Sequence, residues 1–220
     1  MTDAIGLLGG TFDPVHFAHL RLAQVAIERL ALATVRWIPS GQPGHRGPPA
    51  AAVEHRLAML QLAIADDPHF MLDAADARSE VPTFTVNTLA RLRTELGAEV
   101  PLVLIIGADQ LLALDTWWEW KRLFDLAHVA VAQRPRFELK SGALRGELAL
   151  EYARRAGAQV DITTSPAGRI ASFEMTPLDI SSSAIRVDIA SGRSPRYLLP
   201  DAVLDYIAAQ QLYSKETDSR

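Results

Sequence analysis

The sequence predicts an α/β fold with a doubly wound parallel sheet and a small C-terminal helical extension. Three observations predict it. Short apolar runs alternate with amphipathic helical patterns along the chain, as in successive βαβ units. The run at residues 102–106 is apolar throughout, which is typical of a central parallel strand buried on both faces. A glycine turn follows the first apolar run and precedes a helical pattern, an arrangement that suits an anion at the helix start.

The elements of the first half follow from this alternation. Strands are predicted in the short apolar runs at residues 5–8, 34–38 and 70–73. Helices are predicted where apolar residues recur at helical spacing, at residues 20–30, 53–65 and 85–96, and Gly97 is a plausible C-cap of the last. Residues 39–50 contain four prolines and three glycines, so we expect a loop there.

The second half continues the pattern. Strands are predicted at residues 102–106 and 128–132, with an edge strand at residues 169–173. Helices are predicted at residues 144–156, on the surface, and at residues 182–190 and 201–210. We therefore expect a single Rossmann-like domain over residues 1–220, in which about 175–220 form a helical subregion.

Composition excludes several function classes. Hydrophobic residues make up 49% and charged residues 22% of the 220 residues, as in ordinary globular proteins. The net charge of −4 argues against a general nucleic-acid binder. The absence of cysteine excludes disulfides, thiolate metal sites and cysteine nucleophiles. No apolar run is long enough for a membrane span or has the form of a signal peptide, so we expect a cytoplasmic protein without membrane or nucleic-acid partners.

The segment at residues 9–19 is the most informative. Gly9 and Gly10 allow a ligand to approach the backbone closely. His16 and His19 lie where a helix should begin, beside free N–H groups and the positive end of the helix dipole. The pattern favours an anion, in particular a polyphosphate. The alternatives are a metal held by the two histidines, with Asp13 or a distant residue as third ligand, or two surface histidines without function.

A second polar cluster lies at the start of the predicted helix at residues 182–190. It carries hydroxyl and guanidinium groups, from Ser181, Ser182, Ser183 and Arg186. These groups suit phosphate oxygens, and the alternative is an N-cap followed by a solvated arginine. Arg46, in the proline- and glycine-rich loop, and Arg134, after the strand at residues 128–132, could add positive charge.

Two further features follow the central strand. Gly107 and Asp109 come directly after it, where ligands of open α/β sheets bind. Asp109 could accept hydrogen bonds from ribose hydroxyls, or could cap the next helix. Trp117 and Trp118, with Trp120 close by, are expected on one helix, where tryptophans usually fill a core. One of the adjacent pair must point away from the other, and an indole left at a pocket is a stacking platform.

Together these motifs resemble the bacterial nicotinate mononucleotide adenylyltransferases, which belong to the nucleotidyltransferase superfamily with the His-x-Gly-His signature. The resemblance covers essentially the whole chain, in segments at residues 9–16, 41–46, 82–89, 107–109, 116–118, 133–135 and 180–186. The first and last segments are specific to the superfamily, and those around Thr85 and Trp117 point to the nicotinate enzymes. The chain departs from the family pattern at Ala18, where the family usually has Gly, and at Gly44, where it often has Pro.

The resemblance implies transfer of AMP from ATP to nicotinate mononucleotide, giving nicotinate adenine dinucleotide and pyrophosphate, in NAD biosynthesis. It implies His16 and His19 as the catalytic residues. ATP and its phosphates would be bound by Gly9, Gly10, Thr11, Phe12, Arg46, Gly107, Asp109, Arg134, Ser181, Ser182, Ser183 and Arg186. Nicotinate mononucleotide would be bound by Phe84, Thr85, Trp117 and Trp118. Mg²⁺ is expected to bind mainly through the ATP phosphates, with no metal site built from protein ligands.

Other functions stay open. The nearest is a sibling adenylyltransferase or cytidylyltransferase that prefers nicotinamide mononucleotide or another phosphorylated substrate, against which the segments around Thr85 and Trp117 argue. A protein that binds ATP without turning it over is disfavoured because both histidines, Asp109 and Arg186 are present. The sequence assigns no role to residues 136–158, and it leaves the oligomeric state open, a homo-oligomer included.

Overall fold

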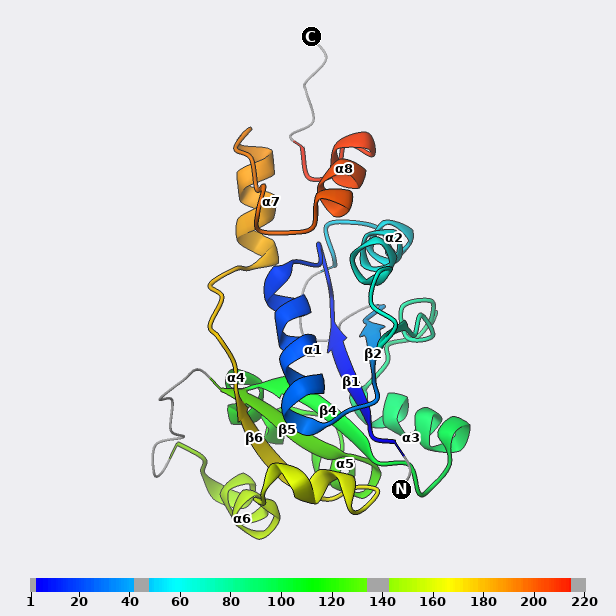
Figure 1. Ribbon diagram of the computed structural model, residues 1–220, viewed down its shortest axis with the longest axis vertical. Coiled ribbons are helices and arrows are strands. Elements are labelled where there is room, and N and C mark those ends of the chain that lie inside the picture. The colour runs from blue at the N-terminus through cyan, green and yellow to red at the C-terminus, as the bar shows by residue number, and fades with distance from the viewer. Residues whose placement is uncertain (1–2, 42–47, 134–142, 215–220) are drawn as a thin grey trace.

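The fold is a parallel sheet between two layers of helices (Figure 1). The computed structural model describes residues 3–41, 48–133 and 143–214. Its strands are β1 (Ile5–Gly10), β2 (Thr34–Pro39), β3 (Phe70–Leu72), β4 (Leu102–Gly107), β5 (His128–Gln133) and β6 (Ile170–Glu174). They pair in the order β3-β2-β1-β4-β5-β6, and every pairing is parallel. This is the order of doubly wound nucleotide-binding sheets, so the predicted fold class is confirmed.

The centre of the sheet is the point where the order of strands reverses. β1 pairs with β2 on one side and with β4 on the other, and Leu7 is in register with both Arg36 and Leu104. The chain therefore winds outward in both directions from β1 and β4. A crevice for a ligand is expected outside the carboxyl ends of these two strands.

Helices cover both faces of the sheet. They are α1 (Phe17–Leu30), α2 (Val53–Ile64), α3 (Thr85–Leu96), α4 (Ala108–Leu112), α5 (Leu123–Leu126), α6 (Gly146–Arg155), α7 (Ser182–Ala190) and α8 (Asp201–Ala209). Three short 3₁₀ turns join them, η1 (Leu114–Thr116), η2 (Trp120–Arg122) and η3 (Gln159–Thr163). One core contains side chains of α1, α2, α7 and α8, and the other contains side chains of α3 to α6.

Strand β4 contributes side chains to both cores. Val103 and Ile105 belong to the core under α1 and α2, while Leu104 and Ile106 belong to the core under α3 to α5. Successive side chains of a strand point to opposite faces, so an apolar residue is needed at each position. The run at residues 102–106 is therefore apolar throughout because both faces are buried, as the sequence predicted.

Two expectations about helices were wrong. Helix α1 begins at Phe17 rather than at residue 20, because His16 already serves as its N-cap. Trp117, Trp118 and Trp120 do not share one helix, since α4 ends at Leu112 and the tryptophans lie in and between the 3₁₀ turns η1 and η2. Elements this short carry too few residues for a periodic pattern.

The C-terminal helices share the core of one layer. α7 and α8 lie at the end of the molecule toward which β1 and β2 point (Figure 1). Ile185, Val203 and Ile207 from these helices belong to the same core as the buried side chains of α1 and α2. Tyr206 Oη on α8 also lies 3.0 Å from His55 Nδ1 on α2. This shared core supports one domain over residues 1–220, which stays a prediction.

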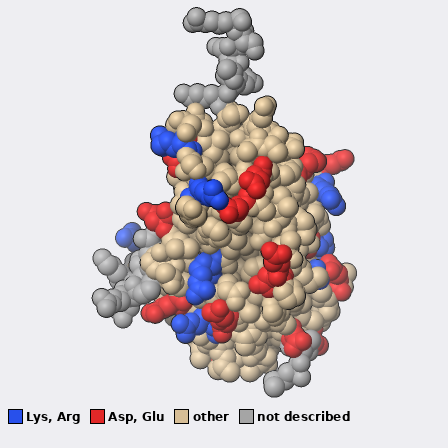
Figure 2. Space-filling view, turned by 45° about the horizontal axis from the view of Figure 1, so that its top comes forward, with Lys and Arg blue, Asp and Glu red and all other residues tan. Residues whose placement is uncertain are grey.

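The surface mixes both signs of charge. On the face seen in Figure 2, acidic and basic side chains are interspersed rather than gathered by sign. Within the described ranges, no helix has the length and apolar character that crossing a membrane requires.

Candidate active site

A cleft of about 490 Å³ lies at the carboxyl ends of β1 and β4. It is lined by the loop after β1, the start of α3, the first turn of α4 and the tryptophan-bearing turns. Eight residues singled out from the sequence line it together, namely Gly9, Gly10, Thr11, Phe84, Thr85, Asp109, Trp117 and Trp118. The volume is typical of small-molecule sites, and the position is the crevice expected from the strand order.

The two glycines at the end of β1 serve different purposes. A Cβ on Gly10 would lie 2.9 Å from the Phe12 ring, so Gly10 is needed for packing within the loop. A Cβ on Gly9 would have the Ile38 carbonyl oxygen, 4.0 Å away, as its nearest neighbour. Gly9 therefore leaves space on the cleft side of the backbone, where a ligand can approach closely.

Phe12 belongs to the core rather than to the cleft wall. Its side chain is 1% exposed, and its ring meets the His19 ring edge-on at a centroid distance of 5.1 Å. Its backbone is left-handed, with φ of 50°, which costs a residue with a Cβ roughly 1–2 kcal/mol. Burial of the ring contributes roughly 1.5–3 kcal/mol and offsets that cost. Only the backbone N–H of Phe12 is left for the predicted contact with ATP.

His16 and His19 form a stacked pair at the start of α1. Their ring centroids are 3.7 Å apart and their planes differ by 22°. The backbone N–H of His16 donates to Nδ1 of His19 at 3.3 Å. A neutral imidazole that accepts at one nitrogen carries its proton on the other, so His19 offers Nε2–H as a donor.

Both imidazoles are neutral at pH 7 before a ligand binds. Burial lowers the pKa of His16 from 6.5 to about 4. Burial and, second, the neighbouring His16 lower the pKa of His19 from 6.5 to about 3. The pair therefore offers hydrogen-bond donors rather than positive charges.

The start of α1 is less open than the sequence indicated. The N–H of Phe17 donates to the carbonyl of Leu198 at 3.0 Å, because the connection between α7 and α8 passes over this turn. The expectation of free N–H groups at this helix start is therefore wrong for Phe17.

The start of α7 packs against the loop after β1. The residues concerned are the predicted phosphate-binding group Ser181, Ser182, Ser183 and Arg186. Ser182 Oγ donates to the carbonyl of Pro14 at 2.8 Å, and Arg186 Nη1 donates to the carbonyl of Asp13 at 2.6 Å. Ser181 is the N-cap, and its Oγ accepts from a first-turn N–H at 3.2 Å. Arg186 is thus held at the loop rather than freely solvated, and the two predicted phosphate-binding segments lie in contact.

Asp13 connects this region to distant parts of the chain. Its carboxylate is buried and accepts from the N–H groups of Ala50 (2.7 Å) and Ala51 (3.1 Å) and from Tyr213 Oη–H (2.7 Å). Arg186 Nη1 lies 3.8 Å from it. From the sequence we considered Asp13 only as a metal ligand, although its place in the motif was a signal of importance. Among the described residues no group of three or more His, Asp or Glu side chains could hold a metal.

Arg56, on α2, is a second residue that the sequence interpretation passed over. Its side chain is 1% exposed. Nη1 donates to the carbonyls of Thr11 (2.8 Å) and Ser40 (2.7 Å), and Nη2 to that of Gly41 (3.4 Å). The available signal was its place on the apolar stripe of α2, four residues before the buried Leu60.

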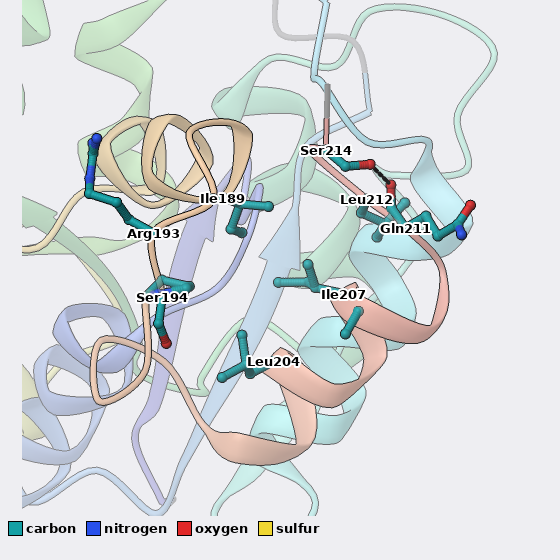
Figure 3. Close-up of a pocket in the computed structure, with 11 residues that line it drawn as sticks. Ile189, Arg193, Ser194, Leu204, Ile207, Gln211, Leu212 and Ser214 are labelled. Carbon is teal, nitrogen blue, oxygen red and sulfur yellow. Dashed lines mark hydrogen bonds between the residues drawn. The ribbon is translucent and has the colours of Figure 1, made fainter. Parts of the chain in front are cut away.

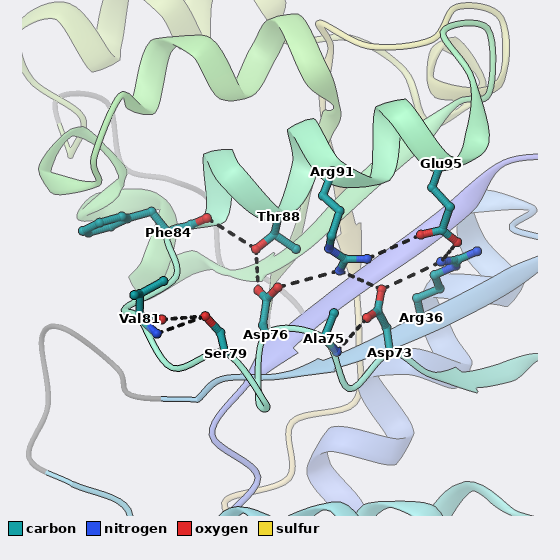
Figure 4. A network of polar contacts seen from close by, with 10 residues as sticks. All are labelled: Arg36, Asp73, Ala75, Asp76, Ser79, Val81, Phe84, Thr88, Arg91 and Glu95. Carbon is teal, nitrogen blue, oxygen red and sulfur yellow. Dashed lines mark hydrogen bonds and ion pairs between the residues drawn. The ribbon is translucent and has the colours of Figure 1, made fainter.

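A network of charged residues supports the start of α3 (Figure 4). Thr88 Oγ1 donates to the Asp76 carboxylate, and both residues line the cleft. Arg91 lies 3.7 Å from Asp76 and 2.8 Å from Asp73. Burial raises the pKa of Asp76, against the opposing effects of Thr88 and Arg91. The network fixes the segment before α3 against the helix whose first turn lines the cleft.

The adjacent tryptophans divide between core and cleft. Trp117 is half-buried and packs against the core under α3 to α5. Trp118 is 59% exposed, and its ring lies 5.9 Å from that of Phe84 between centroids. Trp118 and Phe84 therefore place two neighbouring rings in the lining of the cleft, that of Phe84 partly buried and that of Trp118 exposed.

Asp109 lies on α4, directly after the carboxyl end of β4. The N-cap of α4 is Gly107, whose N–H donates to Gln110 Oε1 at 3.0 Å, so the alternative that Asp109 caps this helix is wrong. Asp109 is exposed in the first turn and lines the cleft. Arg46 and Arg134 lie outside the described residues.

A second cavity, of about 750 Å³, lies between α7 and α8 (Figure 3). It is lined by apolar side chains such as Ile189, Leu204 and Ile207, with Arg193 and Ser194 at its edge. Of the predicted site residues that the structure describes, none lines it.

Comparison with known proteins gives the family. A protein of Dechloromonas aromatica (strain RCB), named probable nicotinate-nucleotide adenylyltransferase, is 51% identical over 214 residues, which are 97% of this chain and 99% of the relative. A protein of Laribacter hongkongensis (strain HLHK9) with the same name is 46% identical over 214 residues, 97% of this chain and 96% of the relative. These relatives confirm the resemblance that the motifs predicted.

The fold has known counterparts as well. The structure of Plasmodium falciparum nicotinic acid mononucleotide adenylyltransferase complexed with NaAD is similar over 96% of this chain and 97% of that chain, with a TM-score of 0.71 and 18% sequence identity. The family described as cytidylyltransferase-like matches residues 7–188. The chain therefore belongs to the cytidylyltransferase-like family.

Proposed function

We propose that this chain transfers AMP from ATP to nicotinate mononucleotide, giving nicotinate adenine dinucleotide and pyrophosphate. The observation that carries the proposal is the cleft at the carboxyl ends of β1 and β4. There the glycine loop after β1 meets a carboxylate, a helix start and an exposed indole. The names of relatives that are 51% and 46% identical over nearly their whole length support it. A single domain and a cytoplasmic location remain proposals from the sequence.

The chemistry needs no protein nucleophile. An oxygen of the substrate 5′-phosphate attacks the α-phosphorus of ATP, the bond from that phosphorus to the bridging oxygen breaks, and pyrophosphate leaves with the electron pair. The difficulty lies in bringing two polyanions together and in stabilising the charge that develops on them. His19, with its proton on Nε2, would donate to phosphate oxygens at the reacting phosphorus, together with His16. Bound phosphates would raise the pKa of both imidazoles.

The triphosphate would lie between the loop after β1 and the start of α7. Gly9, Gly10, Thr11 and the N–H of Phe12 would hold it on one side. On the other side the group Ser181, Ser182, Ser183 and Arg186 would contact the β- and γ-phosphates, with added charge from Arg46 and Arg134. Gly107 and Asp109 would contact the adenosine, the carboxylate accepting from ribose hydroxyls.

The nicotinate ring would bind at the other end of the cleft. Trp117, Trp118 and Phe84 would frame the ring. The first N–H groups of α3, at Thr85, would bind its carboxylate, because the positive end of a helix favours a negative charge. Preference for nicotinate over nicotinamide then follows from this helix start.

Mg²⁺ fits the donors available in the cleft only as an ion carried by the substrate. Asp109 is an exposed carboxylate there, and the described residues contain no group of three or more metal-ligating side chains. Mg²⁺ commonly binds through substrate phosphates, water and one or two carboxylates. When bound, it would neutralise charge on the phosphates.

The test is release of pyrophosphate from Mg-ATP with a panel of acceptors, namely nicotinate mononucleotide, nicotinamide mononucleotide and phosphopantetheine. We expect the first to be turned over with the highest kcat/KM. A higher kcat/KM with either of the others would favour the sibling enzyme. Binding of Mg-ATP without release of pyrophosphate in the presence of any of these acceptors would refute the proposed activity.

A further inference from the structure

Two arginines each bind backbone carbonyls from separate segments, at opposite edges of the sheet. Arg56 binds carbonyls that follow β1 and β2, those of Thr11 and Ser40, at the carboxyl edge where the cleft lies. Arg93 binds carbonyls of Leu126 (2.7 Å) and Val100, which precede β5 and β4 at the amino edge. The two guanidinium groups make the same type of contact, but only one of them contacts residues of the cleft.

Burial of the Arg56 guanidinium lowers the stability of the folded protein. It is 1% exposed, and no Asp or Glu of the described residues lies within ion-pair distance of it. Its Nε has no hydrogen-bond partner in the described part of the chain, and burial lowers its pKa against the weaker opposing effects of Asp13, Tyr213 and Glu54. A buried charge without an ionic partner destabilises a protein, and the position lies on the apolar stripe of α2, where a hydrophobic side chain would pack. Packing alone therefore does not account for an arginine here.

The contact with Thr11 sets the direction of the next backbone donor. A trans peptide is planar, so its C=O and N–H point in opposite directions. Because the Thr11 carbonyl points at Arg56, the N–H of Phe12 points away from it. The described residues provide no acceptor for that N–H. Phe12 is also held in a left-handed conformation, which a hydrogen bond to the preceding carbonyl helps to fix.

We infer that Arg56 is a positioning residue for ATP: it holds the Thr11–Phe12 peptide so that the Phe12 N–H faces the phosphates. The inference rests on the proposed function for its substrate. The fork of the guanidinium is essential, since it reaches carbonyls of two loops at once, whereas a lysine ammonium is a single compact point.

The experiment compares Arg56→Met and Arg56→Lys with Arg93→Met in the full chain. A small misplacement of a positioning group can cost about 10²-fold in rate, so we expect kcat/KM for ATP to fall by about that factor in Arg56→Met and by about tenfold in Arg56→Lys. The KM for the mononucleotide should change by less than about threefold. Arg93→Met should lower Tm but leave kcat/KM for ATP within about threefold of wild type.

Each outcome of this experiment either supports or overturns the positioning role of Arg56. The inference is overturned if the folded Arg56 variants keep wild-type kcat/KM for ATP, or if Arg93→Met loses as much as they do. If Arg56→Met does not fold, Arg56→Lys decides. If neither folds while Arg93→Met does, Arg56 serves the fold and the inference fails. Should wild type release no pyrophosphate, the proposed function fails instead, and calorimetric affinities of the same variants for Mg-ATP then test the positioning role.

Discussion

The stacked histidines predict a specific dependence of stability on pH. Between pH 6.5 and about 4, an unfolded histidine binds a proton that the folded His16 does not. The unfolded state then binds more protons, so the free energy of unfolding falls as the pH is lowered through this window. At about pH 5 each histidine kept neutral costs about 2 kcal/mol, and the pair about 4 kcal/mol.

The test replaces His16 by Asn, which is a good N-cap residue and does not titrate. Urea unfolding of wild type and variant, followed by circular dichroism near pH 7.5 and near pH 5, gives the loss of free energy on acidification. We expect the variant to lose about 2 kcal/mol less than wild type. Carboxylates and the buried His128 are common to both proteins and cancel in this difference. Equal losses would show that the native imidazoles take up protons freely, and the reasoning from their burial would be refuted.

Three further predictions concern turnover. His19→Ala should lower kcat about 10²- to 10³-fold with an unchanged fold, since it removes one preorganised donor. The control is His69→Ala, at an exposed histidine away from the cleft, which should leave kcat unchanged. Steady-state kinetics measures kcat of both variants, and circular dichroism checks their fold. Arg186→Ala should raise the KM for ATP about tenfold through loss of a charge-assisted contact, and a rise only in the KM for the mononucleotide would contradict the triphosphate assignment. Trp118→Ala should raise the KM for the mononucleotide by roughly tenfold, because a stacking ring is lost. The Tm should change little, because the residue is 59% exposed. An unchanged KM would show that Trp118 does not contact the nicotinate ring.

Elements with a long periodic or apolar pattern could be predicted from the sequence. Residues 85–96 form α3 with the predicted bounds, and residues 182–190 form α7. The strand at residues 102–106 was also predicted, because burial on both faces leaves no polar position in it. The turns that carry Trp117 and Trp118 could not be predicted in this way, since three residues of 3₁₀ helix have no period to detect.

The residues of the candidate site also differ in whether the sequence could predict them. Gly9 and Asp109 could be predicted to lie close together because one lies at the end of a strand of the sheet and the other follows a strand, and both line the cleft. His16 is not among the residues that line it, and its role stays a prediction. The contacts that hold these residues were not found. Tyr213 donates to Asp13 across 200 positions of the chain, and no local pattern reports a contact of that separation. Burial and this hydrogen bond raise the pKa of Tyr213, so its hydroxyl remains a donor to Asp13.

A buried polar residue that supports a cleft can be recognised in the sequence, because it interrupts an otherwise apolar stripe of a helix. On α2, Arg56 occupies a position of the stripe that continues with Leu60 and Ile64, and a core helix would gain stability from a hydrophobic residue there. Natural sequences violate such local rules mainly at functional or strained sites. The violation at Arg56 faces the carbonyl of Thr11 in the glycine loop. A charged residue on an apolar helical stripe therefore points to the segment that depends on it, even where the segment itself lies 45 residues away in the chain.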